Sequence, residues 1–90
     1  MSQLASITLY HNDDARPIIE AIIADNPGVR VLNMPGAVKL DCEGELVVKR
    51  ASVEERLGRE WDPQEIHLVL ISMAGHLDED DDQFTVGWKH

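Results

Sequence analysis

Residues 4–28 read LASITLYHNDDARPIIEAIIADNPG, and this stretch decides the fold of the N-terminal half. Residues 4–10 are rich in β-branched and aromatic side chains, which favours a strand. Isoleucines then recur at the spacing of one helical face, and Asn26-Pro27-Gly28 is a typical helix end. The chain therefore opens with a strand followed by an amphipathic helix.

The predicted helix has recognisable signals at its start and along its length. Asp13 or Asp14 is expected to cap it, and Pro17 falls in the first turn, where a missing N–H costs nothing. We expect the apolar stripe of this helix to face the core, and it consists of Ile18, Ile19, Ile22 and Ile23.

Residues 29–50 have the pattern of antiparallel strands. A strand over residues 29–34 leads into Pro35-Gly36, a pair that suits a tight turn. Apolar and polar residues alternate over residues 38–42, and Glu43-Gly44 suits a two-residue hairpin into residues 46–50. This pattern predicts a meander, with Cys42 on its buried face.

The C-terminal half predicts two short helical segments and two more strands. Residues 52–55 have the capping-box form, with Gly58 as the helix end, and residues 62–65 are expected to form a second helical turn or a tight bend. Residues 66–73 are apolar on both faces, which indicates a central strand. Residues 84–88 alternate and are expected to pair with it across the acidic connection at residues 78–83.

These elements predict the fold class. We expect an α+β fold in a single small domain spanning residues 1–90. One long helix and one or two short helices pack on about six antiparallel strand segments, in an order that the sequence does not specify.

Composition narrows the range of functions. Asp and Glu number 17 against 8 Lys and Arg, a formal charge of -9 at pH 7, so nucleic acid and anionic membrane surfaces are unfavourable partners. The single cysteine, the absence of a secretory start and the absence of an apolar run of roughly 18 residues predict a cytoplasmic protein.

No motif for metal, cofactor or catalysis emerges. Counting an EF-hand loop from Asp78 places Gln83 and Lys89 where glycine and glutamate are required. The histidines lack the spacing of a helical metal site, and the glycines form no phosphate loop. We therefore predict no catalytic residue, no cofactor and no metal, and interpret the acidic run as a solvated loop.

Gly75 interrupts a strongly apolar segment. Glycine at such a position either ends a strand or allows another backbone to approach closely. Both interpretations stay open at this point, with strand termination favoured over a role in recognition.

The chain resembles the regulatory, or effector, proteins of soluble multicomponent diiron monooxygenases, most closely the phenol hydroxylase branch. The similarity extends from about Ile7 to Trp88. It is carried by Arg16-Pro17-Ile18-Ile19-Glu20-Ala21-Ile22, Asp25-Asn26-Pro27, Pro35-Gly36 with Lys39 and Asp41, Glu54-Glu55, Leu57-Gly58, Gln64-Glu65, Leu70-Ile71-Ser72, Ala74-Gly75-His76, Asp78-Glu79-Asp80-Asp81-Asp82 and Phe84-Thr85.

The resemblance implies a cofactor-free protein that binds the large subunit of a diiron hydroxylase near its active-site entrance. Such a protein alters substrate and oxygen access, turnover and coupling, and competes with the reductase for an overlapping surface. The segment expected to bind the hydroxylase is Ser72, Met73, Ala74, Gly75 and His76. Relatives that act on methane have small polar residues in place of Met73 and Ala74.

Two other functions remain as alternatives. A helix packed on a short antiparallel sheet also suits a module that binds a small ligand, which a specific ligand would reveal by raising the melting temperature. An acid/base enzyme using Asp and His is the weaker alternative, because no constellation with workable spacing is present.

Overall fold

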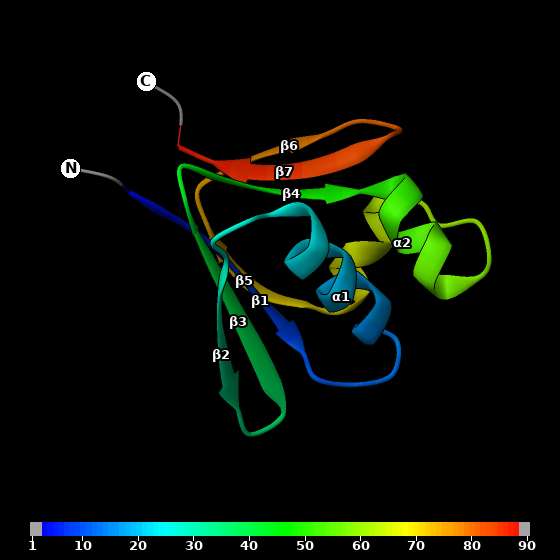
Figure 1. Cartoon of the computed structure of the whole chain (residues 1–90), viewed down its shortest axis with the longest axis horizontal. Coiled ribbons are helices and arrows are strands. Elements are labelled where there is room, and N and C mark those ends of the chain that lie inside the picture. The colour runs from blue at the N-terminus through cyan, green and yellow to red at the C-terminus, as the bar shows by residue number, and fades with distance from the viewer. Residues whose placement is uncertain (1–2, 89–90) are drawn as a thin grey trace.

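The computed structural model describes residues 3–88, which form two antiparallel sheets with helices packed between and beside them (Figure 1). The α+β fold predicted from the sequence is confirmed, with seven strands in this part of the chain. The elements are β1 Leu4–Tyr10, α1 Arg16–Asp25, β2 Arg30–Met34, β3 Ala37–Glu43, β4 Glu45–Lys49, α2 Arg50–Leu57, η1 Pro63–Leu68, β5 Leu70–Ala74, β6 His76–Glu79 and β7 Gln83–Gly87.

The strands divide between a four-stranded sheet of order β2-β3-β1-β5 and a three-stranded sheet of order β4-β7-β6. Helix α1 packs against β4 and α2, and β1 contacts both β4 and β7. The largest fully buried side chains come from both sheets and from the helices, and include Phe84, Ile7, Leu9, Ile22, Leu40, Leu46 and Ile66. One shared core therefore holds the two sheets together.

The predicted meander over residues 29–50 is only partly correct. Strands β2 and β3 pair as expected. The other edge of β3 pairs with β1, whereas β4 pairs with β7 in the other sheet. Gly44 joins them without a hairpin: its N–H donates to the Gln3 carbonyl at 3.1 Å, and its carbonyl accepts from Trp88 N–H at 3.2 Å. Alternation indicates which face of a strand is buried, but does not indicate which strand lies beside it.

The predicted central strand over residues 66–73 is wrong in both extent and position. Residues 66–68 belong to η1, because Asp62 and Glu65 cap this helix reciprocally. The Gln64 N–H donates to the Asp62 carboxylate at 3.0 Å, and the Asp62 N–H donates to the Glu65 carboxylate at 2.9 Å. Strand β5 starts only at Leu70 and lies at the edge of its sheet.

The closing strand β7 pairs with β4 and β6, and not with the 66–73 segment. Two of the five residues of the acidic run therefore belong to a strand: Asp78 and Glu79 end β6, opposite Thr85 and Phe84.

The helix signals were also only partly correct. In α1, Ile18 and Ile22 are buried, but Ile23 is 45% exposed, since the buried face is centred on Ala21. Asn12, not Asp13 or Asp14, accepts the Ala15 N–H at 2.9 Å. The confirmed signals include Pro17 in the first turn and the helix end at Asn26.

Ser52 does not cap α2, because this helix begins at Arg50 and has no side-chain cap. Gly58 ends it with a φ of 79°, as predicted. Cys42 is half-buried rather than fully buried. None of the helices within residues 3–88 is both long and apolar enough to cross a membrane.

Candidate functional site

The predicted binding segment, Ser72–His76, includes one of the connections between the two sheets. Ser72, Met73 and Ala74 end β5, Gly75 lies between the strands, and His76 begins β6. Gly75 is half-buried and the other four residues are exposed. Because β5 pairs with β1 alone within residues 3–88, its other edge offers backbone groups to a partner.

The side chains of this segment alternate between the two faces of the sheet. Met73 lies opposite Ile7, whereas Ser72 and Ala74 lie opposite Thr8 and Ser6. Ser72 and Ala74 are exposed, and the two β1 residues are each only 8% exposed, so the accessible part of this strip across β1 and β5 comes mainly from two small side chains. Small side chains allow another protein surface to approach the sheet closely.

A bulge lies next to this strip. The register of β5 against β1 shifts between Ser72, which is opposite Thr8, and Leu70, which is opposite Leu9. Ile71 is therefore an extra residue, and its side chain is 45% exposed. Bulges reorient side chains at sheet edges, and here the bulge leaves a large apolar residue on the surface.

Gly75 combines both interpretations left open by the sequence, because it ends β5 and also allows a close approach. Its φ is +131°, and a Cβ at this position would lie 2.9 Å from Val86 Cγ1 and 3.1 Å from the Gly87 nitrogen. No side chain fits there without displacement, so the turn from one sheet to the other requires glycine.

His76 extends the segment toward the chain termini. Its ring contacts Trp88 edge to face, with 6.0 Å between the ring centroids. The Trp88 indole N–H donates to the Leu4 carbonyl at 2.9 Å, which ties the end of the described chain to β1.

The acidic run is more ordered than the sequence indicated. One Asp80 carboxylate oxygen accepts the N–H groups of Asp82 at 2.8 Å and Gln83 at 2.9 Å. The Arg50 N–H donates to the Asp82 carbonyl at 2.8 Å, and Glu79 contacts His67. These contacts attach the turn to α2 and η1. Residues 3–88 contain no group of three or more His, Cys, Asp or Glu side chains placed to hold a metal ion.

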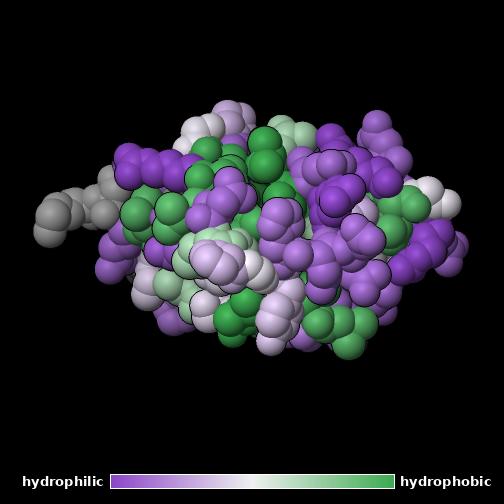
Figure 2. Space-filling view, turned by 90° about the horizontal axis from the view of Figure 1, so that it is seen from below, coloured by the Kyte–Doolittle hydropathy of each residue, from purple (hydrophilic) through white to green (hydrophobic). Residues whose placement is uncertain are grey.

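Exposed apolar side chains lie mainly on β strands and η1 rather than on α2. Figure 2 shows the face seen from below Figure 1, where hydrophobic residues reach the surface among hydrophilic ones. The large hydrophobic residues with the highest exposed fractions are Leu68, Leu32, Tyr10, Ile71, Ile23, Val31, Leu4, Met73 and Leu77.

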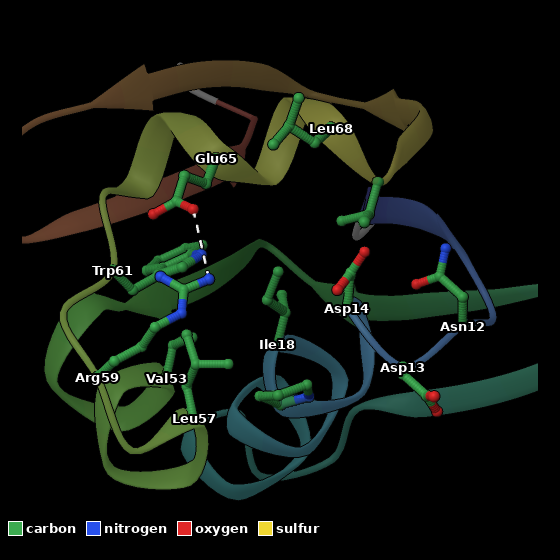
Figure 3. A pocket seen from close by; sticks show the side chains of 12 residues that line it. Asn12, Asp13, Asp14, Ile18, Val53, Leu57, Arg59, Trp61, Glu65 and Leu68 are labelled. Atoms are coloured by element: carbon green, nitrogen blue, oxygen red, sulfur yellow. Dashed lines mark ion pairs between the residues drawn. The ribbon is translucent and has the colours of Figure 1, made fainter.

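A cavity of about 300 Å³ lies away from the Ser72–His76 segment, between the start of α1, the end of α2, and η1 (Figure 3). Trp61 forms one wall and is positioned by Glu54, whose carboxylate accepts the Trp61 backbone N–H at 2.8 Å and the Arg50 Nε–H at 3.1 Å. These bonds from Trp61 and Arg50 lower the pKa of Glu54 below its ordinary value of 4.5.

The fold and the sequence together match one known family over almost the whole chain. The model of the MmoB/DmpM family matches residues 3–87. The chain belongs to the MmoB/DmpM family. The resemblance noted in the sequence is thereby confirmed.

Two curated relatives are also similar over all or most of their length. The chain is 44% identical over 90 residues to the phenol 2-monooxygenase stimulatory component DmpM of Pseudomonas sp. strain CF600, covering 100% of both chains. It is 33% identical over 79 residues to the effector subunit of the alkene monooxygenase system of Xanthobacter autotrophicus, covering 86% of this chain and 78% of that one.

A solved structure agrees with the fold of this family member. A chain in the structure of a phenol hydroxylase–regulatory protein complex superposes with a TM-score of 0.92 at 42% identity, covering 97% of this chain and 100% of that one. The role of the Ser72–His76 segment stays a prediction. No local sequence signal indicated that β5 is an edge strand or that Ile71 is a bulge, because both depend on pairing with β1.

Proposed function

We propose that this chain is a non-catalytic effector that binds the diiron hydroxylase of a multicomponent phenol or related aromatic monooxygenase and raises its turnover and coupling. The observation that carries this proposal is the 44% identity to a phenol 2-monooxygenase stimulatory component over the full length of both chains. The chain similar to this one in the phenol hydroxylase–regulatory protein complex supports the same partner.

Docking through Ser72–His76, close to the active-site entrance of the large subunit, is part of the proposal. This segment is exposed except for the half-buried Gly75, lies on a sheet edge and presents the small side chains of Ser72 and Ala74 beside the bulged Ile71. An edge strand whose accessible side chains are small suits a partner that contributes backbone hydrogen bonds or packs a helix against it.

The effect on the hydroxylase is proposed to be a population shift. The effector must bind one hydroxylase conformation more tightly than another, and a difference of about 1 to 3 kcal/mol changes the populations roughly 5- to 150-fold. Substrate access, oxygen access and coupling then change together, because they belong to the favoured conformation.

The test is steady-state phenol oxidation by a hydroxylase and reductase of this class, titrated with this chain and scored for product and for NADH consumed. We expect the rate and the product formed per NADH to rise to a maximum near one effector per active site. A flat response from substoichiometric to excess effector would contradict the proposal.

Docking is tested separately with Ser72→Arg and Ala74→Arg, which place a long cation on the exposed strip. Ala51→Arg on α2 is the matched control, because Ala51 is also exposed. We expect the two strip variants, once shown to melt like the parent, to need at least tenfold more effector for half-maximal stimulation. Equal behaviour of Ala74→Arg and Ala51→Arg would exclude this segment from the docking surface.

Overlap with the reductase surface makes a further prediction. Excess effector should inhibit, and added reductase should relieve that inhibition competitively. If added reductase did not relieve the inhibition, the overlap between the effector and reductase surfaces would be contradicted. The proposed binding of the effector to the hydroxylase would not be affected.

A further inference from the structure

The cavity beside Trp61 has the size and walls of a small-molecule site. Its volume of about 300 Å³ is at the lower end for ligand pockets. Its apolar lining consists of Pro17, Ile18, Val53, Leu57, Trp61, Leu68 and Val69. Leu68 is 79% exposed, so a ligand in the cavity would remove apolar surface from water on the Leu68 side as well.

Trp61 brings an unused hydrogen-bond donor to this cavity. The residue is only 3% exposed, yet its indole N–H has no acceptor within residues 3–88. Figure 3 shows the ring nitrogen on the side of the indole that faces the centre of the cavity. Among the described residues the only buried side-chain nitrogen or oxygen atom without a partner is Asp25 Oδ2, so the Trp61 indole N–H is open to water from the cavity, and an acceptor atom of a ligand can replace that water.

The charges at the rim select against ions. Asp13 pairs with Arg16 at 3.6 Å, and Arg59 pairs with Glu65 at 3.7 Å across one side of the cavity (Figure 3). Asp14 lines the cavity without an ion-pair partner in the described part of the chain. The remaining negative charge repels an anion, while a simple ammonium ion offers no acceptor to the Trp61 N–H.

We propose that this cavity binds a small uncharged molecule with an apolar ring and one hydroxyl group. The ring packs against Ile18, Val53 and Trp61, and the hydroxyl oxygen accepts the Trp61 indole N–H. This site is a property of the isolated chain and does not depend on the hydroxylase, so its failure would leave the effector function untouched.

The two tryptophans allow a direct test with an internal control. The Trp88 indole N–H already donates to the Leu4 carbonyl, whereas that of Trp61 has no acceptor within residues 3–88. Indole ¹H–¹⁵N resonances of the full chain are followed during titration with phenol at pH 7, where phenol is uncharged. We expect a saturable downfield shift of the Trp61 signal with a millimolar dissociation constant, and a nearly constant Trp88 signal.

Matched probes and variants identify the interaction. Toluene replaces the hydroxyl with a methyl group, and benzylammonium and benzoate add charge; each is expected to bind more weakly than phenol. Trp61→Phe keeps an aromatic wall but removes the donor, and should weaken phenol binding roughly three- to tenfold, whereas Trp88→Phe should not.

Three results would overturn the proposal. If the Trp61 indole resonance does not shift, or shifts no more than that of Trp88, phenol does not bind at the Trp61 indole N–H. Toluene binding as tightly as phenol shows that the oxygen is not recognised. Tighter binding of benzylammonium than of phenol assigns the site to organic cations through Asp14.

Discussion

The side-chain amide of Asn26 pairs with both backbone polar groups of Val47. Its Nδ2 donates to the Val47 carbonyl at 2.8 Å, and its Oδ1 accepts the Val47 N–H at 2.9 Å. The same Nδ2 also donates to the Ile22 carbonyl at 2.8 Å. Since β4 is an edge strand, Asn26 takes the place of one residue of a neighbouring strand and fastens the end of α1 to the sheet.

Replacing Asn26 should therefore destabilise the fold. Asn26 is only 6% exposed, and the Asn26→Ala substitution leaves the Val47 N–H and carbonyl without their partner. We expect a loss of about 2 kcal/mol in the free energy of unfolding, measured with urea. Asn33→Ala, at an exposed position on β2, is the control and should change it by less than about 0.5 kcal/mol. Similar values for both variants would contradict the role of Asn26.

Gly75→Ala should cost more than an ordinary glycine replacement at positive φ. The added Cβ would lie 2.9 Å from Val86 Cγ1, whereas nothing lies within 4 Å of a Cβ built at Gly36, whose φ is +74°. We expect losses of about 3 kcal/mol for Gly75→Ala and about 1 kcal/mol for Gly36→Ala, from thermal unfolding. If Gly75→Ala were the milder of the two, the close approach of Gly75 to β7 would not constrain the turn.

The helix caps make a prediction that opposes the sequence pattern. Ser52 has the capping-box form but lies inside α2, while Asp62 and Glu65 cap η1. Asp62→Ala should therefore lower stability by about 1 kcal/mol, and Ser52→Ala by no more than about 0.5 kcal/mol. Chemical denaturation of both variants checks the order, and a larger effect at Ser52 would restore the pattern-based assignment.

Glu54 should contribute to acid sensitivity. Hydrogen bonds from the Trp61 N–H and the Arg50 side chain lower its pKa in the folded protein below 4.5. Unfolded chains then bind more protons, so the stabilisation is complete above pH 4.5 and is lost as the pH falls through the folded-state pKa. Melting temperatures between pH 6 and pH 3 should fall more steeply for the parent than for Glu54→Gln. Parallel curves would argue against this contribution.

Much of the secondary structure follows from local patterns. The strand at residues 4–10, the helix ended by Asn26, the turn at Pro35-Gly36 and the helix end at Gly58 were all predicted correctly. Each of these features depends on residues that are close together in the sequence, where side-chain periodicity and backbone preferences act directly.

The sites were harder to predict for a physical reason. The exposed segment at residues 72–76 was singled out through family resemblance, and no local signal indicated its edge position. The Trp61 cavity was not predicted, because its lining comes from residues that are separated by up to 57 positions, between Asn12 and Val69.

The sequence by itself determined the fold class, the main helix, the turn at Pro35-Gly36, the helix end at Gly58 and the family. Only the tertiary structure decided that β3 pairs with β1, that β4 pairs with β7, and that β5 lies at an edge. The physical reason is that the alternation of apolar and polar residues specifies which face of a strand is buried. Which strand pairs with it depends on how side chains from distant parts of the sequence pack in one core. Asn26 and Gly75 show this most directly, because the groups they meet, Val47 and Val86, are far away along the chain.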